Sequence, residues 1–293
     1  MARPGPSSKP AQAGRTSGQR PRRGQRGTRD SAEATAVVPG AETKRGEILA
    51  GRNAVYEAIR AGRRRIQRVL LAESAEEKGT LQQIVRLCQR EGIALVEVRR
   101  RDLDEMGVGS EHQGVIAEVS EYPYVELEDL LAVSQQRQED PFFLVLDSLQ
   151  DPQNVGSLLR TAEAVGIHGV ILPDRRAVGV TAAVSRASAG AVEHLLICMV
   201  TNIVRTIEEL KTRGIWVVGV EGDPSAQDYR KVDLNMPLAL VMGSEGAGLR
   251  RLVLERCDLV VRIPMQGHIS SLNVAAAGSI LLYETWSARH RLK

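Results

Sequence analysis

The sequence predicts an α/β protein in which a small α/β unit precedes a C-terminal parallel sheet with helices on both faces. Three observations carry this prediction. Past Pro141, apolar runs alternate with segments of helical periodicity, which is the pattern of a parallel sheet. The run 142–146 is apolar throughout, as in a strand buried on both faces. Aromatic residues make up only 3% of the chain, so aliphatic residues must build the core.

The first 45 residues are predicted to be a disordered basic tail. They contain no Leu, Ile or Phe and are rich in Pro, Gly, Ser and Arg, so they cannot bury enough apolar area to offset the entropy of ordering. They carry 10 Lys or Arg and 3 Asp or Glu, a net +7, although the whole chain carries only +3. This tail either adds sequence-independent affinity for RNA phosphates or is a solvated segment without a role in binding.

A small α/β unit is predicted over residues 46–121. The spacing predicts a helix over 53–60 and strands over 66–71, 93–98 and 114–119. Leu81, Ile84, Val85 and Cys88 share one face of a second helix, because they are spaced i, i+3, i+4, i+7. Basic clusters punctuate the unit and are either solvated loops or RNA phosphate contacts. They comprise Arg63, Arg64, Arg65 and Arg68, then Arg99, Arg100 and Arg101.

Residues 122–140 are predicted to be a connector with one short Leu-rich helix, and residues 141–293 the main domain. The apolar pattern of that domain predicts strands over 142–146, 169–172, 215–220, 238–242 and 259–263. It predicts helices over 155–165, 203–211 and 272–286. In such sheets, ligands bind in the loops beyond the carboxyl ends of the strands, so functional residues are expected in those loops.

The cysteines and the hydropathy pattern exclude two classes of protein. Cys88, Cys198 and Cys257 are widely spaced and match no metal-ligand pattern, so we expect buried free thiols in a reducing cytoplasm and no metal site. No stretch reaches the roughly 20 consecutive apolar residues of a bilayer span, so the sequence excludes an integral membrane protein.

The first loop of interest, residues 147–160, follows the strand at 142–146. Asn154 lies near the expected start of the next helix, where it could cap that helix. Arg160 lies six residues later, on a different face, and could project toward a ligand near the edge of the sheet. The plainer alternative is an ordinary cap followed by a surface arginine.

The second loop, residues 242–249, places Gly243, Gly246 and Gly248 after a buried strand. Glycines allow close approach of the backbone to a ligand, although a tight turn explains them equally well. Their order is neither the dinucleotide fingerprint nor a P-loop, which disfavours a nicotinamide or ATP site. Glu245 lies among these glycines and could bind a ligand hydroxyl or amine, hold an arginine, or remain a solvated turn carboxylate.

The third loop, residues 263–273, leads into the last predicted helix. Ser271 and Asn273 are small polar residues at the start of that helix, where they could cap it or help to bind an anionic group. His268 could act as an acid or base, but the sequence shows no partner for it.

Taken together, the three loops resemble the three motifs of the SpoU (TrmH) family of RNA ribose methyltransferases, in the SPOUT superfamily. The matching residues are Asn154 and Arg160, then Gly243, Glu245 and Gly246, then Ser271, Leu272 and Asn273. The segments 186–194, 51–55 and 112–115 also resemble family segments, the last two from its substrate-binding domain. This domain makes the chain most similar to the RlmB-type branch, which methylates a guanosine 2′-oxygen in 23S rRNA.

The resemblance implies a fold and a cofactor that periodicity does not show. It implies a C-terminal trefoil knot, an exception to the rule against knots. It implies S-adenosylmethionine as the cofactor, without a metal, and a cytoplasmic homodimer whose sites form across the interface. The cofactor would be held by Gly243, Gly246, Ile263, Met265 and Leu272.

It also implies roles in catalysis. Arg160 would face the cofactor of the other protomer, either as a strongly perturbed base or as a cation that stabilises the developing alkoxide. Asn154 and Glu245 would hold Arg160, and Ser271 and Asn273 would orient the ribose. Three alternatives remain: methylation of tRNA or another rRNA site, a non-catalytic RNA-binding factor in ribosome assembly, and a nicotinamide-dependent oxidoreductase, which the missing fingerprint disfavours.

Overall fold

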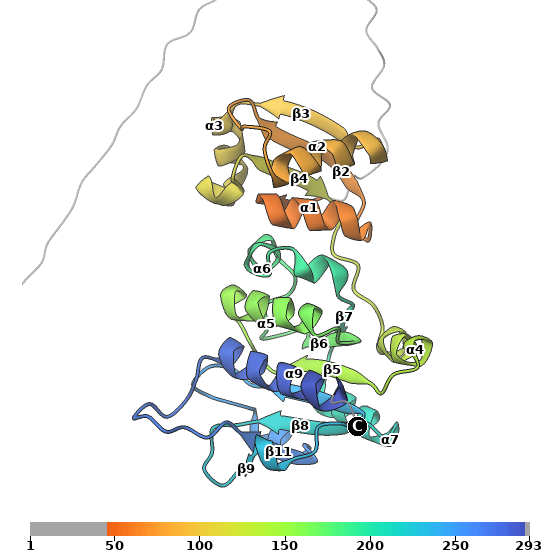
Figure 1. Ribbon diagram of the computed structural model, residues 1–293, viewed down its shortest axis with the longest axis vertical. Helices are drawn as coiled ribbons and strands as arrows, with labels where there is room; N and C mark the ends of the chain where they lie inside the picture. The colour runs from red at the N-terminus through yellow and green to blue at the C-terminus, as the bar shows by residue number, and fades with distance from the viewer. Residues whose placement is uncertain (1–45, 291–293) are drawn as a thin grey trace, which may run out of the picture. The chain divides into compact units, whose positions relative to one another are not determined.

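The structure, a computed structural model, describes residues 46–290 apart from the side chains of residues 107–110. The expected basic tail, residues 1–45, lies outside the described residues, as do residues 291–293. The described chain contains a four-stranded and a seven-stranded sheet (Figure 1). We call residues 46–121 the small lobe and residues 141–290 the large lobe. Within residues 46–290, no helix combines the length and the apolar character that a membrane span needs.

The small lobe is a mixed sheet in the order β1-β4-β2-β3. Strand β4 pairs antiparallel with β1 and β2, whereas β3 pairs parallel with β2. Its elements are β1 (Glu47–Ala50), α1 (Arg52–Ala61), β2 (Ile66–Ala72), α2 (Thr80–Glu91), β3 (Ala94–Val98), α3 (Arg100–Leu103) and β4 (Val115–Val119). The predicted apolar face of α2 is buried against the sheet, as the spacing of Leu81, Ile84, Val85 and Cys88 required.

The large lobe is a fully parallel sheet in the order β7-β6-β5-β10-β8-β11-β9. Its strands are β5 (Phe142–Leu146), β6 (Gly169–Pro173), β7 (Ile197–Val200), β8 (Trp216–Val220), β9 (Gln227–Asp228), β10 (Leu238–Met242) and β11 (Leu259–Arg262). Its helices are α5 (Pro152–Ala164), α6 (Ala182–Ala187), α7 (Ile203–Thr212), α8 (Arg251–Leu254) and α9 (Val274–His290). The predicted parallel sheet is therefore confirmed.

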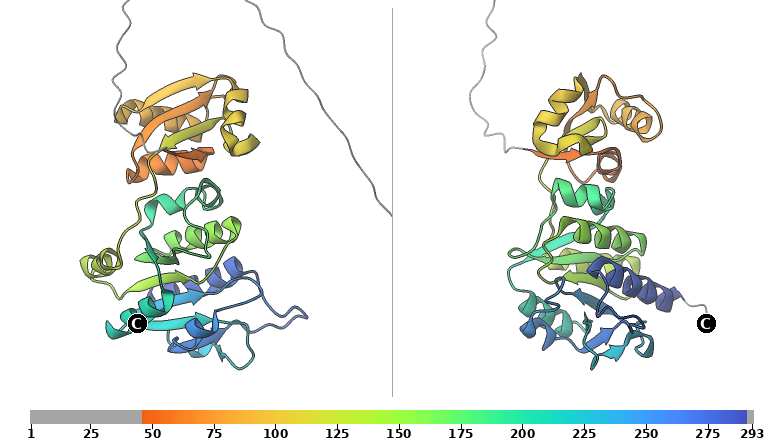
Figure 2. Two further views of the ribbon diagram at one scale, coloured as in Figure 1. Left: turned by 180° about the vertical axis from the view of Figure 1, so that it is seen from behind. Right: turned by 90° about the vertical axis from the view of Figure 1, so that its left-hand side faces the viewer.

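Helices cover both faces of this sheet, as predicted (Figures 1 and 2). The central strand β5 shows why the sequence run is apolar throughout, because neighbouring residues face opposite cores. Leu144 packs with α5 and α9 on one face, and Phe143 and Val145 pack with α7 on the other. Helix α4 (Leu127–Arg137) lies in the segment expected to be a connector and packs Leu130 into the second core.

Two features differ from the sequence predictions. The last helix begins at Val274 rather than at Leu272, because Asn273 is its cap. Arg63 and Arg64 were expected in a solvated loop or against RNA, but the side chain of Arg64 is fully buried and Arg63 is partly buried. Both arginines contact the large lobe or the segment that leads to it, as described below.

The loops that follow β8, β10 and β11 meet at the carboxyl end of the sheet, where the trefoil knot is expected. This arrangement is consistent with a knot, and the knot itself stays a prediction.

Candidate active site

A pocket of about 370 Å³ lies where the loops after β8, β10 and β11 meet the start of α9. This volume falls within the usual range of small-molecule sites. Its lining includes every residue expected around the cofactor, namely Gly243, Gly246, Ile263, Met265 and Leu272. Three of the expected catalytic residues also line it, namely Glu245, Ser271 and Asn273.

The glycines of the second loop form a tight turn that shapes this pocket. Ser244 and Gly248 exchange backbone hydrogen bonds of 3.0 and 2.9 Å, which close the turn directly after β10. A Cβ atom at Gly243 would lie 2.2 Å from the backbone carbon of Gly248, so no other residue fits there without moving the turn. Gly246 and Gly248 have φ angles of 76° and 65°, which glycine adopts without strain.

Asn273 joins the three loops through its side chain. Its Nδ2 atom donates to Oδ1 of Asn154 at 2.8 Å and to Oε1 of Glu245 at 2.7 Å. Its Oδ1 atom accepts from the backbone amides of Ala275 and Ala276, which caps α9. The expected residues from loops one, two and three therefore meet at one side chain.

The cap of α5 is Asp151, not Asn154 as the sequence suggested. The Asp151 carboxylate accepts from the backbone amides of Gln153 and Asn154 at 3.3 and 3.1 Å. Asn154 lies inside the helix with only 8% of its surface exposed, which leaves its side chain free to accept from Asn273. Asp151 was not predicted as the cap, although Pro152 after it was a signal that could have found it, because proline is favoured at the first position of a helix.

Arg160 lies apart from the other candidate residues of its own chain. It is exposed on α5 and does not line the pocket. Among the residues that the structure describes, none forms a hydrogen bond or ion pair with it. Asn154 and Glu245 were expected to hold Arg160, but within one chain both bind Asn273 instead.

The pocket is anionic. Glu221 and Glu245 both line it, and its described lining contains no Lys, Arg or His. The Glu221 carboxylate accepts from the backbone amide of Leu249 at 3.0 Å, which holds it against the glycine turn. Glu221 was not predicted as a site residue, although its position directly after a predicted strand was a signal that could have found it.

A second hollow of about 510 Å³ adjoins the first and shares Ser244, Glu245 and Val274 with it. Arg176 and Arg250 line it, together with Asn154. Arg250 is held by the fully buried carboxylate of Asp147 through contacts of 2.6 to 3.0 Å. Asp147, Arg176 and Arg250 were not predicted as site residues, because charged residues in loops are common and their spacing along the sequence matches no motif.

Neither His268 nor the cysteines join the site. His268 is exposed and lines neither hollow. Cys88 and Cys198 are buried as expected, and Cys257 is partly buried. Burial raises the pKa of the Cys88 and Cys198 thiols to about 11 and that of Cys257 to about 12. Among the described residues, no group of three or more His, Cys, Asp or Glu could hold a metal ion.

Two family models match the chain. Residues 141–283 match the model described as the SpoU rRNA Methylase family. Residues 48–125 match the model described as RNA 2′-O ribose methyltransferase substrate binding. The first match covers all three loops of the site, and the second covers the small lobe.

Full-length relatives and solved structures agree with these models. YacO of Bacillus subtilis, described as a TrmH family tRNA/rRNA methyltransferase, is 47% identical over 244 residues, which are 83% of this chain and 96% of YacO. The SpoU methyltransferase AviRb from Streptomyces viridochromogenes, solved with AdoMet, has a TM-score of 0.68 at 27% identity and covers 85% of this chain and 94% of its own. An AdoMet-bound rRNA methyltransferase from Sinorhizobium meliloti has a TM-score of 0.67 at 27% identity, over 85% and 89% of the two chains.

Proposed function

Since the chain belongs to the TrmH (SpoU) family of RNA methyltransferases, we propose that it methylates a ribose 2′-oxygen of RNA with S-adenosylmethionine. The observation that carries the proposal is the charge of the pocket. Two carboxylates and no cationic side chain line it, so it suits a sulfonium cation. The same charge disfavours the pyrophosphate of a nicotinamide dinucleotide, which is the rival cofactor class.

The residues that line the pocket fit S-adenosylmethionine in shape and in polarity. Gly243 and Gly246 give a backbone wall without side chains, against which a planar base can lie. Ile263, Met265 and Leu272 supply apolar surface, and Glu221 supplies a carboxylate that can accept from ribose hydroxyls. The sulfonium supplies an activated methyl group, so the chemistry requires no metal.

The polar residues at the rim of the pocket would orient the methyl acceptor. Asn273 holds Glu245 and Asn154 in place, so these three side chains present a fixed set of donors and acceptors. Ser271 is exposed at the same rim and can hydrogen-bond a ribose hydroxyl. Fixing the 2′-oxygen in line for attack supplies much of the rate acceleration in such a reaction. The adjoining hollow, with Arg176 and Arg250, would receive the target nucleotide.

Arg160 would act on the pocket of a second copy. It is exposed on α5, and α5 lies beside α9 (Figure 1). Helix α9 exposes the apolar side chains of Ile280, Tyr283 and Trp286. A homodimer formed through this face would cover the exposed apolar patch and bring Arg160 of the partner subunit toward the cofactor. Because a guanidinium stays protonated in water up to a pH of about 12, Arg160 would stabilise the developing alkoxide as a cation rather than act as a base, and the 2′-hydroxyl proton would pass to water as the methyl group leaves the sulfonium.

Mixing two inactive variants tests the shared site. Arg160→Ala and Asn273→Asp each inactivate a homodimer, but a mixed dimer keeps one site with an intact pocket and an intact arginine. Random pairing of the two variants should therefore restore about a quarter of wild-type activity. Activity that stays at the level of the separate variants would show that Arg160 serves its own chain.

The proposed target is a guanosine ribose in 23S rRNA, which would place the enzyme in the cytoplasm. Support comes from the small lobe, which matches a substrate-binding model, and from the sequence resemblance to the RlmB-type branch. Methylation of tRNA is the second candidate, since YacO is described as a tRNA/rRNA methyltransferase.

Incubation of the protein with radiolabelled S-adenosylmethionine and unmodified 23S rRNA, 16S rRNA or tRNA tests the target. Recovery of 2′-O-methylguanosine from 23S rRNA is the expected result, and label in tRNA alone would overturn the proposed target. A non-catalytic assembly factor would bind the cofactor and RNA but would transfer no label to any of the three RNAs.

A further inference from the structure

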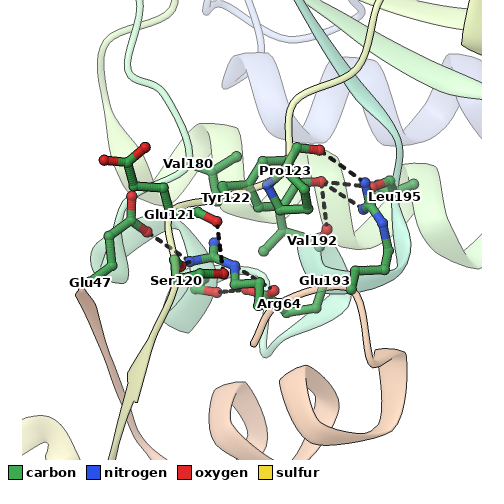
Figure 3. Close-up of polar contacts among 12 residues, drawn as sticks. Glu47, Arg64, Ser120, Glu121, Tyr122, Pro123, Val180, Val192, Glu193 and Leu195 are labelled. Atoms are coloured by element: carbon green, nitrogen blue, oxygen red, sulfur yellow. Dashed lines mark hydrogen bonds and ion pairs between the residues drawn. The ribbon is translucent and has the colours of Figure 1, made fainter. Parts of the chain in front are cut away.

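A buried ion pair connects the two lobes (Figure 3). The Arg64 side chain, just after α1, is fully buried, and its Nε atom lies 2.9 Å from Oε2 of Glu193. Glu193 belongs to the short turn η3 (Ala191–His194) of the large lobe and is 1% exposed. Its second oxygen accepts from Oγ of Ser185 at 2.7 Å. The opposite end of the guanidinium lies 2.7 Å from Oε2 of Glu47 in the small lobe.

Tyr122 packs beside this ion pair, in the segment that joins the lobes. The guanidinium of Arg64 lies 4.9 Å from the centre of the Tyr122 ring, within the range of a cation–π contact. The Tyr122 hydroxyl donates to the backbone oxygens of Val192 and Leu195 in the large lobe. Arg63 donates from Nη1 to the same Leu195 oxygen and to the Tyr122 hydroxyl.

Two further polar side-chain contacts flank this contact between the lobes. Nε2 of His194 lies 2.8 Å from Oε2 of Glu57 on α1, and Arg186 on α6 lies 2.5 Å from Glu111. Gly190 lies so close to α1 that a Cβ atom there would be 2.7 Å from Cβ of Glu57. The polar contacts therefore form one continuous interface between α1 and the α6–η3 segment.

A buried ion pair contributes little net stability, because desolvation of both charges offsets their attraction. The pair instead constrains the relative position of its two partners, since a buried charge that is separated from its partner is strongly unfavourable. Arg64 therefore favours the one orientation of the lobes in which Glu193 lies opposite its guanidinium. An apolar interface would tolerate sliding or rotation far better.

We propose that Arg64 is a positioning residue, which fixes the small lobe on the large lobe so that RNA bound by the small lobe is presented to the methyl-transfer pocket at one geometry. This proposal rests on the proposed function for its consequence in catalysis, but the fixed orientation is a property of the protein alone. A rigid connection raises the effective concentration of the target ribose at the pocket.

The test uses three variants of the full chain. Arg64→Met removes the charge but leaves Glu193 buried without its partner, so that variant could misfold. The double variant Arg64→Met/Glu193→Gln removes both charges and avoids that cost. Arg68→Met is the control, because Arg68 forms a bidentate ion pair with Glu118 that lies wholly within the small lobe.

Distances between spin labels report the orientation directly. Labels at Gln89→Cys in the small lobe and Lys231→Cys in the large lobe occupy exposed positions. The native thiols do not compete for the reagent, because burial raises their pKa to about 11 or 12. Labelled protein is diluted into an excess of unlabelled protein, so that a homodimer carries one labelled chain. The wild type and Arg68→Met should then give one narrow distance distribution, and the double variant a broad one. A narrow, unshifted distribution in the double variant would overturn the proposal.

Kinetics of the same variants test the consequence. In the double variant, kcat for RNA should fall about tenfold, while the affinity for RNA and the stoichiometry of cofactor binding stay at wild-type values. A merely structural defect would instead lower the stoichiometry of cofactor binding. An unchanged kcat beside a broad distance distribution would overturn the positioning role. If the wild type transferred no methyl group to RNA, the proposed function would fail, but the spin-label distances would still decide the role of Arg64.

Discussion

The side-chain amide of Asn273 donates a 2.8 Å hydrogen bond to Oδ1 of Asn154, a residue 119 positions earlier in the chain. The same nitrogen lies 2.7 Å from a carboxylate oxygen of Glu245, and the same residue caps α9. One side chain therefore links the rim of the pocket to the start of two helices. Asn273 caps α9 through its oxygen and contacts Asn154 and Glu245 through its nitrogen, so substitutions can test the two roles separately.

Asn273→Asp should strongly reduce activity without unfolding the protein. Aspartate keeps the oxygen that caps α9, so the variant should keep this cap and stay folded. It cannot donate to Asn154 and it repels Glu245, so kcat should fall about a hundredfold. Asn273→Ala should also lower the free energy of unfolding by about 1 kcal/mol, because the cap of α9 is lost. Thermal unfolding and methyl transfer measured together check both effects, and full activity of Asn273→Asp would contradict the account.

Gly243→Ala should disrupt the glycine turn. The added Cβ would lie 2.2 to 2.4 Å from backbone atoms of Gly248 and Leu249, which cannot move without opening the turn. We expect a loss of about 1 to 3 kcal/mol of stability and a large loss of cofactor affinity. Gly267→Ala is the control, because a Cβ there meets no atom within 4 Å. Calorimetric binding of S-adenosylmethionine separates the two variants, and equal affinities would refute this description of the turn.

Glu221→Gln should weaken the binding of S-adenosylmethionine more than that of S-adenosylhomocysteine. Glutamine keeps an oxygen for the amide of Leu249 but removes one negative charge from the pocket. Both ligands lose the carboxylate contact to the ribose, but only the first carries a sulfonium, so its Kd should rise about tenfold more than that of the second. Asp223→Asn removes a nearby charge outside the pocket and serves as the control. Equal losses for both ligands would show that Glu221 does not act through charge.

His168 should make the protein less stable as the pH falls below about 6.5. Burial lowers the pKa of His168, and its Nδ1 atom accepts from the amide of Phe142, so the neutral ring is the form that fits. As the pH is lowered, His168 therefore takes up a proton in the unfolded chain at a higher pH than in the folded protein. The free energy of unfolding then decreases as the pH decreases. Denaturant unfolding at pH 7 and pH 5 should show a smaller decrease for His168→Gln than for the wild type. His268→Gln, at an exposed position, should behave as the wild type.

The sequence predicts the large lobe well because its strands are buried on both faces. The run around Leu144 has no polar interruption, and α5 and α7 show clear helical periodicity. The short elements β7 and α6 were not predicted, since four and six residues are too few to establish a period.

The candidate site was predictable in its residues but not in its connections. Glycines, Glu245 and Asn273 stand out at strand ends, whereas the bond between Asn273 and Asn154 joins distant loops that only the fold brings together. Arg64 was misjudged for the same reason. A run of arginines usually indicates a solvated surface, and nothing near it in the sequence reveals Glu193 as its partner.

The proposed methylation of ribose is tested by locating the methyl group on the labelled RNA. RNA labelled by the wild type from radioactive S-adenosylmethionine would be hydrolysed with alkali, which requires a free 2′-hydroxyl at each cleaved position. The label should appear in alkali-resistant dinucleotides, and Asn273→Asp should give about a hundredfold less label in the same time, although it still binds the cofactor. Label in mononucleotides would place the methyl group on a base, and it would contradict the proposal that this pocket methylates ribose.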